Sequence, residues 1–294
     1  MQKILCLDVG GTSIKSAIYQ TDGKLLETFE SVATNASEIK LGETILKVVK
    51  ERLALNSGVS GIAIASAGVI DSEAGKVIYS GYTIPNYTET EIKKNVESLT
   101  GLPCEVENDA NCAGLAEMWQ GAGQDYQSGV CLTVGTGVGG AVIINGQLVK
   151  GRGFTAGEVG YMPVNGQNFQ DVASTTSLIA RVNQLSLEKA YQSGEEIFKA
   201  AKEGNQECVQ GIDELITNLA AGISIIMYLL NPDVIVLGGG IMAQKDYLHD
   251  KLMKRVSETI IDRQFATSAI VFAEHQNNAG MVGALYQFNH KNSR

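Results

Sequence analysis

Long apolar runs and targeting signals are missing from this 294-residue sequence. No apolar run reaches the roughly 20 residues that a membrane-spanning helix requires, and the run around Ile223–Leu230 stops at Asn231-Pro232. The N-terminus, MQKILCLDVGG, does not have the form of a signal peptide, because an aspartate and paired glycines interrupt its apolar stretch. We therefore expect a cytoplasmic protein without membrane contact.

Paired cysteines and a histidine-based catalytic pattern are missing as well. The five cysteines are widely spaced and form no CxxC pair, and Cys6 and Cys131 lie in apolar runs typical of strands, where reduced core thiols are common. The three histidines, His249, His275 and His290, lie near no acid–nucleophile pattern. This argues against disulfides, against a cysteine metal site and against a Ser/His/Asp hydrolase.

An excess of positive charge is the third missing feature. The formal net charge of −9 argues against a nucleic-acid partner, because binding phosphate backbones needs a basic face. With 44% hydrophobic and 19% charged residues, the composition suits a globular enzyme with one large core or two smaller ones. No low-complexity segment or long Pro/Ser linker is present, so we expect two domains without a flexible tether.

A pattern of strands joined by glycine-rich turns occurs twice. We expect strands at 3–9, 13–19, 24–32, 61–65, 103–107, 130–134, 141–145, 147–149 and 234–237, with helices at 38–55 and 88–100. The repetition predicts an α/β fold of two similar domains with a cleft between them. We place the first domain at 1–108, completed by a C-terminal helix at about 277–294, and the second at 109–276.

Two glycine hairpins carry the first candidate chemistry. In Asp8-Val9-Gly10-Gly11-Thr12, backbone N–H groups could approach phosphate oxygens, and Asp8 could hold Mg²⁺ directly or through water. GTGVGG at 135–140 has the same character, and it differs from a P-loop because no GK[ST] follows. Each could be an ordinary hairpin turn, but as a pair they could hold a phosphate chain from both sides.

Three further segments could bind ligands. GGG at 238–240 follows an apolar strand, and a flat adenine or ribose could lie against its bare backbone, although a closely packed helix start is the alternative. ENDAN at 107–111 offers more polar groups than one helix cap needs, so Asp109 is either the cap or a base for a sugar hydroxyl. Glu158, in GFTAGEVGY, either accepts hydrogen bonds from a ligand or lies on the surface.

Together the motifs resemble the ROK family of sugar kinases and sugar-responsive repressors, which has the actin-like, hexokinase-like ATPase fold. DVGGT, ENDAN, GTGVGGA, AGE and GGG follow one another in the family's order over nearly the whole chain. The resemblance implies ATP-dependent, Mg²⁺-dependent phosphorylation of a sugar hydroxyl, with Asp109 as the base. It also implies a sugar site formed by Gly68, Asn86, Asn108, Asp109 and Glu158, and an ATP site formed by Asp8, Gly10, Gly11, Thr12, Lys15, Thr136, Gly137, Gly239 and Gly240.

One departure from the family pattern concerns zinc. Many relatives have a histidine and a cysteine-rich zinc motif after AGE, whereas this chain has Tyr161 there and neither Cys nor His between Met162 and Thr176. We expect no zinc site, because the thiolate and imidazole ligands are missing. The segment resembles the zinc-free branch of β-glucoside and N-acetylmannosamine kinases.

The expected substrate is the 6-hydroxyl of a hexose or of a β-glucoside such as cellobiose, with N-acetylmannosamine, glucose or fructose as alternatives. A repressor would carry a DNA-binding domain before DVGGT, and here seven residues precede Asp8. A sugar sensor without catalysis is a second rival, and an acetate-kinase-like or glycerol-kinase-like enzyme is a third. The family also implies a homodimer.

Overall fold

The computed structural model describes residues 1–34, 40–81, 84–186 and 189–292. The chain forms two compact units. The first unit consists of Met1–Trp119, Lys150–Ala156 and Asn277–Arg294, and the second consists of Gln120–Val149 and Gly157–Gln276.

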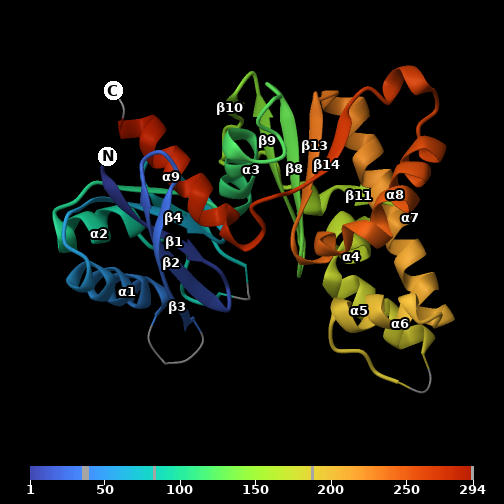
Figure 1. The fold of residues 1–294 in the computed structure, drawn as a ribbon, viewed down its shortest axis with the longest axis horizontal. Helices are drawn as coiled ribbons and strands as arrows, with labels where there is room; N and C mark the ends of the chain where they lie inside the picture. Colours follow the sequence, from blue (N-terminus) through green and yellow to red (C-terminus); the bar gives the residue numbers. More distant parts are fainter. Residues whose placement is uncertain (35–39, 82–83, 187–188, 293–294) are drawn as a thin grey trace. The chain divides into compact units, whose positions relative to one another are not determined.

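The first unit is built around a five-stranded sheet with the order β3-β2-β1-β4-β7 (Figure 1). The three strands β1, β2 and β3 are antiparallel neighbours, and β4 and β7 continue the sheet in parallel with β1. Its elements are β1 (Lys3–Val9), β2 (Ser13–Gln20), β3 (Leu25–Ala33), α1 (Leu41–Leu55), β4 (Val59–Ser66), β5 (Val69–Asp71), β6 (Lys76–Tyr79), α2 (Ile92–Thr100), β7 (Cys104–Asn108), α3 (Asp109–Gln120) and α9 (Ala279–Asn292).

Helices cover both faces of this sheet. Alternate residues of β1 point to opposite faces, so Leu5 and Leu7 pack with α1 and α2, whereas Ile4 and Cys6 pack with α3 and α9. Figure 1 shows α9 lying across the sheet on the side opposite α1. Because α9 follows β14 in the chain, the first unit is completed by residues from the far end of the sequence.

The second unit repeats this sheet plan. Its order is β10-β9-β8-β13-β14, with β8, β9 and β10 antiparallel and with β13 and β14 parallel to β8. Its elements are β8 (Gly129–Val134), β9 (Val138–Ile144), β10 (Gln147–Leu148), η1 (Val159–Tyr161), β11 (Pro163–Val164), β12 (Gln167–Asn168), α4 (Phe169–Ala173), α5 (Thr175–Leu185), α6 (Gly194–Lys202), α7 (Gln206–Leu230), β13 (Val234–Gly238), η2 (Gly240–Gln244), α8 (Lys245–Thr259), η3 (Arg263–Phe265), β14 (Ala269–Phe272) and η4 (Gln276–Asn278). The predicted α/β fold with two similar sheets is thus confirmed.

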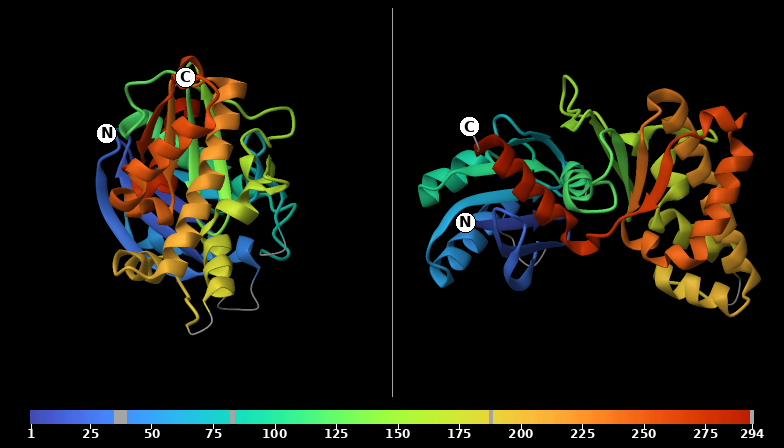
Figure 2. Two further views of the ribbon diagram at one scale, coloured as in Figure 1. Left: turned by 90° about the vertical axis from the view of Figure 1, so that its right-hand side faces the viewer. Right: turned by 45° about the horizontal axis from the view of Figure 1, so that its top comes forward.

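Helix α7 organises the core of the second unit, and Figure 2 shows it running beside α8. Among the described helices, α7 alone is long and apolar enough to cross a membrane by length and composition, and 56% of its most apolar stretch is buried inside the protein. Ile212, Leu219 and Ile223 are fully buried, as in the core helix of a globular unit.

Most of the expected elements are present with shifted ends. The second helix begins at Ile92 instead of Thr88, and β9 begins at Val138 instead of Ala141. Part of the helix expected at 38–55 lies outside the described residues, and its described part begins at Leu41. The internal contacts extend the first unit through Trp119, so α3 belongs with β7, and a domain boundary at 108/109 stays a prediction.

Candidate active site

The β1–β2 turn presents the first group of predicted site residues, Asp8, Gly10, Gly11, Thr12 and Lys15. Asp8 and Lys15 are direct cross-strand partners, and Lys15 Nζ lies 3.7 Å from Asp8 Oδ2. The turn is held by Thr34, whose hydroxyl donates to the Gly11 carbonyl at 2.7 Å and whose N–H donates to the Thr12 carbonyl at 3.0 Å. This bracing leaves the Thr12 side chain exposed.

The Asp8 carboxylate lies against the first turn of α9. A Cβ built at Gly280 would be 2.8 Å from Asp8 Cγ, so only glycine leaves the carboxylate its place. Burial raises the pKa of Asp8 above its ordinary value, and the Lys15 ammonium opposes this shift. A partly buried carboxylate beside a glycine turn suits Mg²⁺, which typically takes one or two carboxylates together with phosphate oxygens.

The β7–α3 junction decides which residue caps the helix. The Asn111 N–H donates to Asn108 Oδ1 at 3.0 Å, which is the bond of a helix N-cap, and α3 begins at Asp109. The interpretation of Asp109 as the cap is therefore wrong, because Asn108 supplies the capping oxygen. Asp109 Oδ1 accepts from Asn108 Nδ2 at 3.0 Å and from the Ala110 N–H at 2.8 Å, so the carboxylate has a defined orientation.

The loop after β4 lies beside this junction. Asn108 Nδ2 also donates to the Gly68 carbonyl at 2.9 Å. Gly68 has a φ of 99°, and a Cβ there would lie 2.7 Å from the Tyr79 carbonyl oxygen, so the position requires glycine. Gly68 and Asn108 are therefore in contact, as their assignment to one sugar site requires.

Asn86 lies in an exposed turn with a φ of 58°. The next residue, Tyr87, is fully buried and hydrogen-bonded to Ser66 at 2.7 Å between the two hydroxyls. The Asp109 carboxylate contributes to the raised pKa of Tyr87, after burial as the main cause. Tyr87 thus links the turn that contains Asn86 to Ser66 and to the surroundings of Asp109.

The second group of predicted residues lies in the second unit. The Gly135 carbonyl accepts from the Thr175 N–H at 2.8 Å, and the Thr136 carbonyl accepts from the Thr176 hydroxyl at 2.8 Å. The hairpin between β8 and β9 is thus tied to the first residues of α5. Gly137, at its tip, is close to Gln170 of α4, whose Oε1 would be 3.0 Å from an added Cβ.

Glu158 follows a tight backbone contact. Gly157, with a φ of 91°, packs against Gly140 so closely that an added Cβ would lie 2.6 Å from the Gly140 carbonyl oxygen. This contact fixes the loop of Glu158 to the glycine hairpin of the same unit. Glu158 is exposed at the surface of this unit, and the partial burial of its carboxyl group raises its pKa above the ordinary value.

The raised pKa of Glu158 gives a prediction of modest size, because solvent screens an exposed carboxyl group. Because the folded-state pKa is raised above the unfolded value near 4.5, the folded protein binds the proton more tightly, and the free energy of unfolding falls as pH rises through this interval. Glu158→Gln cannot ionise, so its Tm should rise relative to the wild type between acidic and neutral pH. Thermal melts over a pH series measure this difference, with Glu27→Gln on exposed strand β3 as control. A Tm difference for Glu158→Gln that does not grow with pH would contradict the expected shift.

Gly239 and Gly240 follow β13. Gly239 has a φ of 95°, and an added Cβ would lie 2.3 Å from the Val134 carbonyl oxygen of the neighbouring strand β8. The bare backbone of the GGG turn therefore packs directly against the start of the glycine hairpin. The GGG turn is thus closely packed, as the alternative to a ligand site requires. The same packing places the GGG turn beside the GTGVGG hairpin, so one ligand could still contact both segments.

The predicted residues form two groups, one in each unit. The first holds Asp8, Gly10, Gly11, Thr12, Lys15, Gly68, Asn86, Asn108 and Asp109, and the second holds Thr136, Gly137, Glu158, Gly239 and Gly240. The sequence did not indicate three residues that support the first group: Thr34, Tyr87 and Gly280. Each of them contacts a residue more than 20 positions away in the chain. Their roles in binding and catalysis stay predictions.

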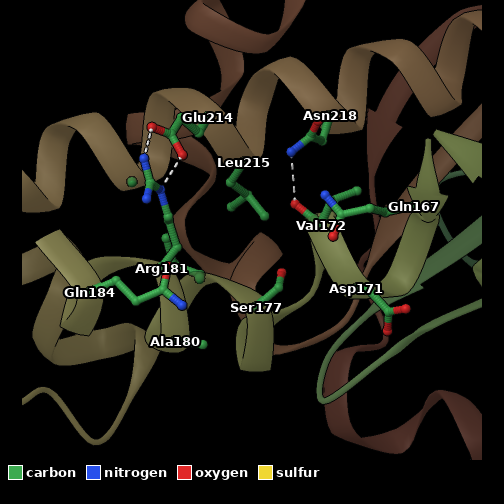
Figure 3. A pocket seen from close by; sticks show the side chains of 12 residues that line it. Gln167, Asp171, Val172, Ser177, Ala180, Arg181, Gln184, Glu214, Leu215 and Asn218 are labelled. Carbon is green, nitrogen blue, oxygen red and sulfur yellow. Dashed lines mark hydrogen bonds and ion pairs between the residues drawn. The ribbon is translucent and has the colours of Figure 1, made fainter. Parts of the chain in front are cut away.

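None of the predicted residues lines the groove shown in Figure 3. This groove of about 390 Å³ lies between α5 and α7 and is lined by residues including Ser177, Gln184 and Asn218. Arg181 and Glu214, which also line the groove, form a bidentate ion pair. Arg181 Nε lies 2.6 Å from Glu214 Oε2, and Arg181 Nη2 lies 2.9 Å from Glu214 Oε1. The third charged residue of the groove, Asp171, accepts from Asn168 Nδ2 at 2.9 Å.

The remaining expectation about metals is that the chain has no zinc site. Within the described ranges of the chain, no group of three or more His, Cys, Asp or Glu side chains could hold a metal ion. The sequence after Tyr161 forms the short β11–β12 ribbon and α4. A lone carboxylate such as Asp8 is not such a cluster, and it would depend on phosphate oxygens and water for the other Mg²⁺ ligands.

Comparison with known proteins identifies the relatives of the chain. A β-glucoside kinase from Listeria monocytogenes is 34% identical over 99% of both chains. A ROK family protein from Streptococcus pneumoniae, solved in complex with sucrose, is 31% identical with a TM-score of 0.87 and 99% coverage of both chains. A ROK glucokinase from Streptomyces griseus, solved with glucose and AMPPNP, is 28% identical with a TM-score of 0.80, over 97% of this chain and 98% of the other.

These structures share the two-domain, hexokinase-like α/β fold. The model of the ROK family matches residues 4–291, which is nearly the whole chain. Both units, the two glycine hairpins and ENDAN lie inside the matched range. The chain therefore belongs to the ROK family.

Proposed function

We propose that this protein is an ATP-dependent sugar kinase that transfers the γ-phosphoryl group of ATP to a sugar hydroxyl. The observation that carries the proposal is the Asp109 carboxylate, oriented by Asn108 and by the Ala110 N–H at the start of α3. Such a carboxylate can align a hydroxyl and accept its proton during phosphoryl transfer. The relatives named as β-glucoside kinase and glucokinase support this function.

The remaining residues take the roles that binding of two substrates requires. Gly68, Asn86, Asn108 and Glu158 bind the sugar hydroxyls. The two glycine hairpins, through Gly10, Gly11, Thr12, Thr136 and Gly137, donate N–H and hydroxyl groups to the phosphates, with Lys15 adding a positive charge. Gly239 and Gly240 border the adenosine. Mg²⁺, held near Asp8, supplies positive charge that offsets the charge of the phosphates.

The preferred acceptor is the 6-hydroxyl of a hexose or of a β-glucoside such as cellobiose. Identity above 30% to β-glucoside kinases from three bacteria supports the β-glucoside. Glucose, fructose and N-acetylmannosamine are the alternatives. The proposal includes a cytoplasmic enzyme without a nucleic-acid partner, which the net charge of −9 favours. The expected homodimer is tested by light scattering after gel filtration.

An ATP-consumption assay tests the proposal over cellobiose, other β-glucosides, glucose, fructose, N-acetylmannosamine and N-acetylglucosamine. We expect Mg²⁺-dependent turnover with at least one of these sugars and the highest kcat/KM for a β-glucoside. Turnover only with N-acetylmannosamine would keep the kinase and replace the substrate. Binding of Mg·ATP without turnover on any sugar would overturn the proposal in favour of a sugar sensor.

A further inference from the structure

Glu107 is a carboxylate buried immediately before the proposed base. It lies near the end of β7 and is only 2% exposed. Its Oε1 accepts from the Asn108 N–H at 2.9 Å and from Asn111 Nδ2 at 3.0 Å. Both donors belong to the ENDAN segment, so the carboxylate of Glu107 is hydrogen-bonded to residues at the start of α3.

These two asparagines connect Glu107 to Asp109. Asn111 donates its N–H to Asn108 Oδ1, which sets the side-chain amide of Asn108 so that its Nδ2 faces Asp109 Oδ1 at 3.0 Å. A continuous set of hydrogen bonds therefore runs from the Glu107 carboxylate to the Asp109 carboxylate. Displacing either asparagine would change the direction in which Asp109 points.

The other oxygen of Glu107 faces two elements from distant parts of the chain. Oε2 lies 3.4 Å from Gln287 Nε2 of α9 and 3.8 Å from Lys150 Nζ. Lys150 also pairs with Glu73 at 3.0 Å and begins the 150–156 segment that the chain contributes to the first unit before Glu158. The two oxygens of Glu107 thus have separate partners: the ENDAN amides contact Oε1, and Gln287 and Lys150 contact Oε2.

Glu105 provides a comparison on the same strand and the same face. It is also buried, but its oxygens lie 2.7 Å from Lys93 Nζ and 3.2 Å from Lys291 Nζ, so two ammonium groups neutralise it. The Lys150 ammonium group lies farther from Glu107, at 3.8 Å, and the short contacts of Glu107 are with the amides of ENDAN. A buried carboxylate is costly unless its partners satisfy it, and here they are the neighbours of the proposed base.

We propose that Glu107 is a positioning residue, which fixes Asn108 and Asn111 so that the Asp109 carboxylate is aligned with the attacking hydroxyl. This inference rests on the proposed function of Asp109. A misplacement of about 1 Å at a reacting group can cost on the order of 100-fold in rate. The loss should therefore fall on kcat, whereas KM for ATP depends on the glycine hairpins, which Glu107 does not contact within the described part of the chain.

The test compares Glu107→Met, Glu107→Gln and the matched variant Glu105→Met. Glu107→Met, which offers no acceptor to Asn108 and Asn111, should lower kcat by about 10-fold or more with KM for ATP within about two-fold. Glu107→Gln keeps one carbonyl oxygen for the two donors and should recover most of that loss. Glu105→Met should lower Tm and leave kcat within about two-fold of the wild type.

A second variant keeps the proposal testable if Glu107→Met does not fold. Asn111→Ala removes one link between Glu107 and Asn108, and it should lower kcat several-fold with little change in KM for ATP. The proposal is overturned if kcat of Asn111→Ala matches the wild type, or if Glu105→Met lowers kcat as much as Glu107→Met. A wild-type protein without kinase activity would instead overturn the proposed function itself, and a fully active Asp109→Asn would overturn the role of Asp109 as the base.

Discussion

Replacing Asp109 by asparagine should abolish phosphoryl transfer while leaving the fold and sugar binding in place. Asparagine has the same shape, and its carbonyl oxygen can still accept from Asn108 Nδ2 and from the Ala110 N–H. It cannot take the proton of the attacking hydroxyl. General-base catalysis contributes roughly 10²–10⁴-fold to rate, so kcat should fall by at least this factor.

The measurement is a coupled ATP-consumption assay with the best sugar of the panel, together with sugar titration by calorimetry and a thermal melt. Asp71→Asn is the matched control, because Asp71 Oδ1 also accepts two backbone N–H bonds, from Glu73 and Ala74, in a turn outside the proposed site. Its kcat should equal that of the wild type. An Asp109→Asn variant that turns over at the wild-type rate would remove Asp109 from the mechanism.

The sequence predicted the plan of the two sheets because the relevant signals are local. Apolar runs such as KILCLDV alternate with glycine turns, and these features alone predict strands and hairpins. The order of β4 and β7 in the sheet could not be derived in this way. It depends on parallel pairing between strands separated by helices, and no local pattern specifies that pairing.

The site was predicted to the level of the segment and less well to the level of the residue. In ENDAN, the sequence left open whether Asp109 is the helix cap or a base, although Asn108 is an equally good capping residue. The structure decides it through one hydrogen bond, from the Asn111 N–H to Asn108 Oδ1. The sequence predicts no separate role for Glu107 within the motif. One reason is that its partner Gln287 lies 180 residues away, so the burial of Glu107 against α9 follows from the tertiary fold.

Gly280 illustrates the same limit. Nothing in the sequence AGMVGAL suggests a role for this glycine, since it lies in a helix and far from DVGGT. Its importance follows from packing, because a Cβ at this position would occupy the place of the Asp8 carboxylate. Close approach between distant segments is set by the tertiary fold and can be recognised only when the segments are placed.

Replacing Gly239 by alanine should destabilise the second unit strongly and weaken ATP binding. The φ of 95° is unfavourable for any residue with a side chain, and the new Cβ would lie 2.3–2.6 Å from backbone atoms of Val134. Left-handed strain and overpacking each cost on the order of 1–3 kcal/mol, so we expect a loss of about 3 kcal/mol or more in the free energy of unfolding. Urea denaturation of the purified variant measures this loss.

Gly240→Ala is the matched control, because the two glycines are adjacent in one turn but differ in backbone and surroundings. Among the described residues, none outside the immediate chain neighbours places an atom within 4 Å of a Cβ built at Gly240, and its φ is outside the left-handed range. Its free energy of unfolding should change by less than about 0.5 kcal/mol. If Gly240 borders the adenosine as proposed, its added methyl group should raise KM for ATP while Tm stays constant. Equal destabilisation by both variants would show that the turn tolerates no side chain at all, and the contact between Gly239 and Val134 would no longer explain why glycine stands there.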